Sequence, residues 1–483
     1  MTVQEEENII TSKSKIEINT ELVLNDYEKE LTKSYVRKID IRILPIVVIM
    51  YIASSLDRGN IGVALKNGLV ESLKLSPSEQ ANVTSLFTLC YIAFEAPANM
   101  LLKRLRPRIW FTFIVCAWSL CCMYLAIAKS AIDFTIARCL LGVFEAGFTP
   151  GIVAFLPYWY VKSEIGLRMS IFFTALPIAG IIGGPVGASL VQVKSSILKP
   201  YQVVFLTEGS ITLFLGICVY FLFYDYPDTF KHFTPEEREV ALRRITASQG
   251  LASKSKITRK QTIAAFMDWK VYAFGIVGFG PNNCLVIFGY FGPTIITGMG
   301  YSPTTATYMS GIPYCFGLIG SFISSYYINR VQIYKIYLIS TPLNIIGYSC
   351  AAFTRINALR MAGLCLSNFA TCLSVAYVAT WMSVNCGSVS KRMVSTAILL
   401  TFTGLAGFVT PYMFTTKQQP DYVLGNTFNI VMLCLTFITT IILKVYFERQ
   451  NKYRDENPVD VSHLSEQEQQ DLNDQHPNFR YRL

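Results

Sequence analysis

Ionisable side chains lie inside long apolar runs of this 483-residue sequence, where they could carry charge chemistry. Asp57 and Arg58 are adjacent in SSLDRGNIGVA, so on a helix they point about 100° apart and can meet different partners. Arg138 and Glu145 are two helical turns apart and share one helix face. A charged side chain at the centre of a membrane helix costs about 2.5–3.5 kcal/mol on insertion scales. Such residues therefore face a partner or a polar cavity.

The acids and the arginines in these runs predict that proton binding is coupled to the binding of an anion. A carboxyl group keeps its proton in an apolar environment and loses it beside an arginine, and a conformational change can alternate the two environments. We therefore predict that Asp57 and Glu145 carry protons and that Arg58 pairs with a substrate carboxylate. The alternative is an ion-pair network that only locks helices together.

Another acid, Glu95, is a further candidate. Glu95 lies in YIAFEAPANMLLKRLRP, and we predict that it braces a gate by pairing with the basic loop that follows, which contains Arg104 and Arg108. The alternative is a second intramembrane acid in the cavity.

Aromatic and amide side chains could line a substrate cavity. Tyr290 precedes Gly292-Pro293, and Trp381 lies one helical turn before Asn385, whose amide offers a donor and an acceptor. We predict that Tyr290, Trp381 and Asn385 contact the substrate, with core or lipid-facing packing as the alternative for the aromatic residues.

A glycine-rich stretch, AGIIGGPVGAS (179–189), contains Gly184 and Pro185. Clustered glycines let helices approach closely, and a proline bends a helix. We interpret the stretch as tight packing at an interface between two halves of the molecule, although a similar pattern also marks antiporters. TGLAGFVTP (403–411) is its counterpart later in the chain.

Twelve apolar segments must position these residues, since a membrane span needs roughly 20 apolar residues. A polar stretch, 225–270, divides six segments from six, and Thr234 with Glu237 forms a capping-box pattern that predicts a short helix there. The twelve segments are 41–63, 83–102, 110–128, 133–157, 169–191, 203–224, 271–296, 304–328, 334–353, 361–385, 393–415 and 423–447.

This pattern predicts an all-α membrane protein built of two six-helix halves around a cavity. We expect a cytosolic tail over 1–40, a first half over 41–224, a cytosolic linker over 225–270, a second half over 271–447 and a cytosolic tail over 448–483. Both tails are polar, and we expect them to be unstructured.

The composition supports a lipid environment. Of the residues, 52% are apolar and only 15% are charged, against about a quarter charged in soluble proteins, and the mean hydropathy is +0.39. The net charge of +10 is spread over short clusters between apolar runs. This is the positive-inside pattern, which puts both termini in the cytosol and argues against nucleic-acid binding.

Several chemistries lack their signatures. The thirteen cysteines show no zinc or disulfide spacing, the three histidines lie outside the apolar segments, and no Walker-type glycine loop occurs. We therefore expect no metal, no cofactor other than protons as the coupling ion, no enzymatic activity and no ATP-driven pump.

Together these motifs resemble fungal anion:cation symporters of the major facilitator superfamily, the group of the allantoate and nicotinate permeases, over about residues 40–450. The motifs are LDRGNIG (56–62), FEAPANMLLKRLRPRIW (94–110), RCLLGVFEAGFTPG (138–151), PYWYVKSEIGLR (157–168), AGIIGGP (179–185), YFGPTIITGMGYSPTTA (290–306) and QPDYVLGN (419–426). The superfamily signature after the second span is degenerate here, because KRLRPR keeps its positive charge without its glycine and aspartate.

The resemblance implies twelve helices and proton symport of an organic anion into the cell. It places the family's coupling roles on Asp57, Arg58 and Glu145, with Arg138 as the local partner of Glu145. We expect a vitamin-like monocarboxylate such as nicotinate, pantothenate or biotin as substrate, and a monomer in the plasma membrane. An exchanger, a facilitator and a nutrient sensor without net transport are the alternatives.

Overall fold

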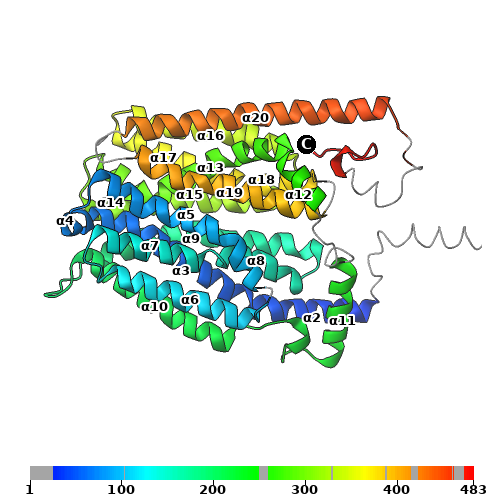
Figure 1. Ribbon diagram of the computed structural model, residues 1–483, viewed down its shortest axis with the longest axis horizontal. Coiled ribbons are helices and arrows are strands. Elements are labelled where there is room, and N and C mark those ends of the chain that lie inside the picture. Colours follow the sequence, from blue (N-terminus) through cyan, green and yellow to red (C-terminus); the bar gives the residue numbers. More distant parts are fainter. Residues whose placement is uncertain are drawn as a thin grey trace, which may run out of the picture.

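The computed structural model describes residues 25–102, 104–249, 259–327, 330–386, 389–414, 422–459, 461 and 473–483. In these ranges the regular structure is entirely helical, and most helices run along one common direction (Figure 1). The prediction of an all-α architecture is therefore confirmed.

The helices before the polar stretch form what we call the N-terminal half. They are α2 (Asp26–Arg42), α3 (Leu44–Lys66), α4 (Leu69–Leu73), α5 (Pro77–Leu102), α6 (Pro107–Leu125), α7 (Ala131–Glu145), α8 (Phe148–Phe155), α9 (Lys162–Leu190) and α10 (Pro200–Leu222). The polar stretch itself contains α11 (Pro235–Gln249) and α12 (Arg259–Phe266).

The helices after it form the C-terminal half. They are α13 (Trp269–Thr297), α14 (Pro303–Met309), α15 (Ile312–Tyr327), α16 (Ile333–Phe353), α17 (Asn357–Ser374), α18 (Tyr377–Val384), α19 (Val389–Met413) and α20 (Val423–Glu456). In the view of Figure 1 the two halves lie one above the other.

Eleven helical segments in the described ranges are long and apolar enough to cross a membrane. The twelfth segment expected from the sequence, 304–328, is present as α14 and α15, and the helix is interrupted at Ser310 and Gly311. With 16 residues, α15 is shorter than the roughly 20 that a span requires, so α14 and α15 together correspond to the expected segment.

The outer surface of the bundle is apolar, whereas polar and charged side chains are buried inside it. This distribution reverses that of a soluble protein and suits a lipid environment. Large exposed apolar side chains include Ile132, Ile211, Phe214, Phe221, Ile319, Phe322, Ile339, Ile438 and Ile442.

One end of the bundle carries α11, α12 and residues 473–483, and we call it the linker end (Figure 1). The opposite end carries α4 and α14. At the linker end, α11 packs on α2, where Ser34 and Lys38 both donate hydrogen bonds to Glu237, at 2.7 and 2.8 Å. The predicted capping box is confirmed, since Thr234 and Glu237 bond each other's backbone N–H groups.

Parts of both predicted tails are ordered, so the expectation of unstructured tails is wrong for them. Residues 26–42 form α2, which Asn25 caps and whose Tyr35 and Ile39 are buried. Residues 473–483 pack against the C-terminal half, and α20 continues to Glu456. Residues 1–24 lie outside the described ranges.

The halves touch most closely toward the opposite end, through α3 with α13, α5 with α19, and α9 with α14 and α15. A Cβ on Gly62 would lie 2.5 Å from the carbonyl oxygen of Tyr290, and a Cβ on Gly184 would lie 2.6 Å from that of Thr307. Ser85 Oγ also donates to the carbonyl of Phe408, at 2.8 Å. These contacts close the opposite end between the two halves.

Candidate functional site

A cavity of about 630 Å³ lies between the two halves. At its inner end it reaches Thr88 and Gly407, and toward the linker end it reaches Asn99 on α5 and Met393 on α19. The cavity therefore extends away from the closed opposite end. Its charged and polar lining includes Arg58, Asn60, Glu95, Asn99, Asn282, Tyr91, Tyr290 and Tyr314.

Arg58 joins this cavity to a buried acid. Its Nε donates to Glu145 Oε1 over 2.6 Å, and its guanidinium lies 4.8 Å from the centre of the Tyr91 ring. The Arg58 side chain keeps 27% of its surface exposed, while that of Glu145 is fully buried. The guanidinium can therefore hold Glu145 and still present N–H groups to an anion in the cavity.

Glu145 is only partly satisfied in this arrangement. Its Oε1 also accepts a hydrogen bond from the Ser54 hydroxyl, whereas Oε2 has no hydrogen-bond partner within the described ranges. A buried carboxylate with one free oxygen depends strongly on its single counter-charge. Protonation of Glu145 would remove its hold on Arg58.

Arg138 lies in the same half without contacting Glu145. Its Nε donates to the carbonyl of Val83 at 3.2 Å, and its guanidinium lies 4.6 Å from the centre of the Phe87 ring. The prediction that Arg138 is the local partner of Glu145 is wrong in this conformation. Two helical turns separate the two side chains by about 10 Å along the axis, and Arg58 from α3 fills the position beside Glu145.

The terminal nitrogens of Arg138, Nη1 and Nη2, have no hydrogen-bond partner among the residues described here, although the side chain is fully buried. Such a group is costly to keep unpaired.

Asp57 faces away from the cavity, into the packing of α3 against α6 and α10. It accepts hydrogen bonds from Trp118 Nε1 at 3.2 Å, Thr212 Oγ1 at 3.1 Å and Cys122 Sγ at 3.6 Å. The expectation that Asp57 and Arg58 meet different partners is confirmed. Asp57 does not line the cavity, and all three of these donors are neutral.

One buried acid was missed by the sequence analysis. Glu208 on α10 accepts a hydrogen bond from Asn60 at 2.8 Å, and Asn60 lines the cavity. Glu208 lies inside the predicted segment 203–224, so the cost of an intramembrane charge would have identified it.

The other predicted residues divide into two groups. Tyr290, Glu95 and Gly184 line the cavity, and Gly184 also forms the close contact between halves that its glycine-rich stretch predicts, one residue before Pro185 within α9. Across the described ranges, Glu95 forms no ion pair with the basic loop after α5. Arg104 is exposed there, and Arg108 stacks on Tyr220 while its backbone N–H bonds Asp225.

Trp381 and Asn385 lie outside the cavity, so the prediction that they contact substrate there is wrong. Both sit at the linker end, where Trp381 Nε1 and Asn385 Nδ2 donate to the carbonyl of Arg482, at 3.1 and 2.9 Å. Periodicity places them on one helix face, but it does not give their depth along the bundle. Their polar groups serve the C-terminal segment.

Comparison with known proteins agrees with this geometry. Residues 47–411 match the family model of the Major Facilitator Superfamily, which is most of the chain. The chain belongs to this superfamily. The chain is 29% identical over 477 residues to the MFS-type transporter cnsO of Penicillium expansum, covering 93% of this chain and 90% of that one.

Two further relatives extend the comparison. A protein of Agrobacterium vitis to which tartrate transport is attributed is 31% identical over 302 residues, covering 62% of this chain and 65% of that one. The structure of the proton:xylose symporter XylE covers 83% of this chain and 95% of its own, with a TM-score of 0.64 and 13% identity, and so supports the fold.

These findings confirm the coarse predictions. This major facilitator is a multi-pass membrane protein and a secondary transporter, not an enzyme. The predicted fold class is confirmed.

Proposed function

We propose that this protein is a proton-coupled symporter that carries a small organic anion into the cell, within the anion:cation symporter group that its motifs resemble. The observation that carries the proposal is the position of Arg58, which faces the cavity and is bound by the buried Glu145. One guanidinium is thereby available to two carboxylates, that of the protein and that of the substrate. Competition between the two for Arg58 couples a proton to the anion.

The transport cycle follows from this competition. In the outward-facing state Glu145 is protonated and neutral, so Arg58 is free to bind the substrate carboxylate. Rocking of the two halves then exposes the cavity at the linker end. Glu145 loses its proton, pairs with Arg58 and displaces the anion. The Arg58–Glu145 pair at 2.6 Å and the closed opposite end support this proposal, because the cycle expects both after release.

Asp57 and Glu208 lie away from the Arg58–Glu145 pair, and their roles in this proposal are secondary. Asp57 is held by neutral donors, and Glu208 is joined to the cavity through Asn60. Neither contacts an arginine in the described ranges, in contrast to Glu145 with its partner Arg58. We propose that Asp57 is a second proton site, reached only when α3 moves against α6 and α10.

The substrate class rests on size and charge. A volume of about 630 Å³ suits a small molecule, and Arg58 is the charged donor that faces it with its partner buried behind it. The relative to which tartrate transport is attributed supports an organic anion. We propose a vitamin-like monocarboxylate, with both termini in the cytosol and the plasma membrane as the location. Exchange without net proton movement is the competing mechanism.

The test is uptake of a radiolabelled panel by transporter-deficient yeast that expresses the protein. The panel is nicotinate, pantothenate, biotin, allantoate, a dipeptide and cysteine, at an external pH of about 5 and about 7, with and without an uncoupler. We expect one anion to accumulate faster at the lower pH and to lose accumulation with uncoupler. Uptake that ignores the uncoupler would favour exchange or facilitated diffusion.

The variant Glu145→Gln sharpens this test. A glutamine is neutral at all pH values, so it cannot displace the anion from Arg58 by losing a proton. We expect concentrative uptake to be lost while exchange of internal for external substrate persists. Glu239→Gln, an exposed acid on α11, is the matched control and is expected to behave as the parent protein. Concentrative, pH-dependent uptake by Glu145→Gln would refute the coupling role.

A further inference from the structure

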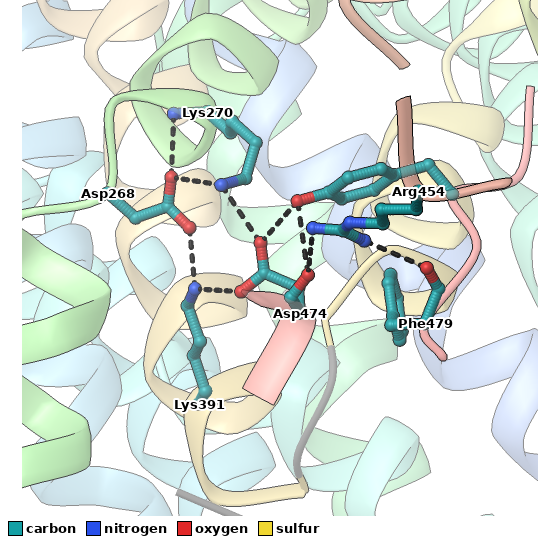
Figure 2. A network of polar contacts seen from close by, with 7 residues as sticks. Asp268, Lys270, Lys391, Arg454, Asp474 and Phe479 are labelled. Carbon is teal, nitrogen blue, oxygen red and sulfur yellow. Dashed lines mark hydrogen bonds and ion pairs between the residues drawn. The ribbon is translucent and has the colours of Figure 1, made fainter. Parts of the chain in front are cut away.

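Residues 473–483 lie at the linker end and insert an acid between two lysines. Asp474 is bound by Lys270 Nζ at 2.9 Å and by Lys391 Nζ at 2.6 Å. The same two lysines bind Asp268 at 3.0 and 2.6 Å, so four charges of alternating sign form a ring (Figure 2). Although burial opposes it, Lys270 and Lys391 lower the pKa of Asp474 to about 2. Asp474 is therefore ionised at every physiological pH.

Two asparagines of the C-terminal half form hydrogen bonds with the backbone of this segment. Asn385 donates to the carbonyl of Arg482 at 2.9 Å and accepts from its N–H at 2.8 Å. Asn451 makes the same pair of bonds with Tyr481, both at 2.8 Å. Paired bonds of this type recognise a main chain in the way that a neighbouring strand does.

An aromatic anchor completes the contact. The Tyr481 ring stacks on Phe447 with 4.5 Å between ring centres and an angle of 13°, and the Arg454 guanidinium lies 4.9 Å from the Tyr481 ring centre. The Tyr481 hydroxyl donates to Asp474 Oδ2 at 2.8 Å. Arg454 also donates to the carbonyls of Phe479 and Asp474, each at 2.8 Å (Figure 2).

The groups that hold the segment come from separate helices of one half. They lie on α13, α16, α18, α19 and α20, where Ile333 of α16 donates its N–H to the carbonyl of Leu483 at 3.1 Å. Each of these helices has its own backbone bonds without the segment. A carboxylate subsite, two backbone-reading amides and an aromatic platform together have the composition of a peptide-binding site.

We propose that the linker end of the C-terminal half is a peptide-binding site, and that the chain's own residues 474–483, the C-terminal latch, occupy it reversibly. The chemistry of the site defines its occupant: an acidic side chain, an aromatic ring seven residues later, and between them a turn closed by the bond from Phe479 N–H to the carbonyl of His476. Lys391 lies in the first turn of α19, and Met393 and Thr396 in the following turns line the cavity. Docking of the latch therefore fixes the start of α19, which forms part of the cavity wall toward the linker end.

The experiment uses Cys386, which directly follows Asn385 and is buried, as a native reporter. Purified protein in detergent is treated with a maleimide, and modification of Cys386 is followed by peptide mass spectrometry. We expect Asp474→Asn, and a truncation after Leu472, to raise the rate by about tenfold or more, because modification requires local opening. Hydrogen exchange in residues 391–400 should rise as well, and that in α5 should not.

Asp455→Asn is the matched control, since it also removes an aspartate that binds the segment. Its partner is Arg480 at 2.8 Å, in an exposed ion pair whose contribution to docking should be small. Equal modification rates for Asp474→Asn and Asp455→Asn would overturn the proposal. This comparison remains decisive if the truncated protein does not fold.

A synthetic peptide of residues 473–483 tests the site itself. Added to the truncated protein, it should restore slow modification of Cys386, whereas the same peptide with asparagine at position 474 should not. Rapid modification that neither peptide slows would show that no peptide site exists there. None of these outcomes depends on which substrate is carried or on proton coupling.

Discussion

The interior of the N-terminal half contains ionisable side chains, whereas that of the C-terminal half contains neutral polar ones. Asp57, Glu145, Glu208 and Arg138 are all buried in the first half. In the second half, Asn283 bonds Asn429 at 2.8 Å and Asn344 bonds Thr371 at 2.9 Å. Within the described ranges, the buried charges of the second half lie near its ends, at Arg360, Lys391 and Asp474.

This contrast separates two ways of using buried polarity. A neutral amide network is satisfied when its members bond each other, and it then holds helices in one register. A buried charge costs more and becomes uncompensated whenever its partner changes protonation. We therefore expect the N-terminal half to carry the coupling chemistry and the C-terminal half to provide a stable wall against which it works.

The two halves are also held differently at the linker end. Ion pairs from α11, including Lys38 with Glu237, stabilise the first half, and the C-terminal latch stabilises the second. Each half is thus stabilised at the linker end by its own contacts, as expected for bodies that move relative to each other.

The largest effect is expected from Arg58→Ala. It removes the counter-charge of the fully buried Glu145, which should cost about 3–5 kcal/mol of stability and abolish anion uptake. Thermal unfolding in detergent and radiolabel uptake measure the two losses. Adding Glu145→Gln to Arg58→Ala should recover most of the stability without recovering uptake. A double variant no more stable than the single one would contradict the charge argument.

A smaller effect is expected from Gly62→Ala, which tests whether the halves must touch to close the opposite end. The added methyl would meet the carbonyl of Tyr290 at 2.5 Å, so the closed arrangement should lose about 1–3 kcal/mol. Distances between spin labels on α4 and α14 should shift toward a wider population. Gly166→Ala, where a Cβ meets nothing within 4 Å, is the control. An unchanged distance distribution in Gly62→Ala would argue against closure by this contact.

Asn429→Ala probes the neutral network of the second half. It leaves Asn283 without its amide partner, and a stranded buried polar group costs about 1–3 kcal/mol. We expect a lower melting temperature but unchanged pH dependence of uptake per folded molecule. Asn457→Ala, at the exposed end of α20, should change neither. A shifted pH profile in Asn429→Ala would mean that coupling extends into the second half.

The smallest effect is expected from Glu237→Gln, which removes the ion pair between α11 and α2 in the first half. The pair with Lys38 is partly exposed, so its loss should cost no more than about 1 kcal/mol. Although burial raises it, hydrogen bonds from Lys38 and Ser34 hold the pKa of Glu237 below its usual value of 4.5. The stabilisation is therefore present above that pH and is lost as pH falls through the lowered value. Relative to the intrinsic exchange rate, hydrogen exchange in α11 should become faster on acidification in the parent protein and show little pH response in Glu237→Gln.

Much of the site could be predicted because charge in an apolar segment is costly and rare. That reasoning identified Asp57, Arg58, Arg138 and Glu145, all of which lie in one half of the bundle. It would also have identified Glu208 had it been applied to every span. The aromatic and amide candidates had no such constraint, and only Tyr290 of those three lines the cavity.

The sequence by itself determined the helical segments, their membrane environment and the presence of internal charge, because hydrophobic length and the cost of charge in lipid act locally along the chain. Only the tertiary structure decided which charges meet. Arg58 rather than Arg138 reaches Glu145 because its side chain extends from α3 to the last residue of α7, and Asn385 serves the C-terminus because α18 ends beyond the cavity. Depth and side-chain direction depend on how helices pack, which no single segment specifies.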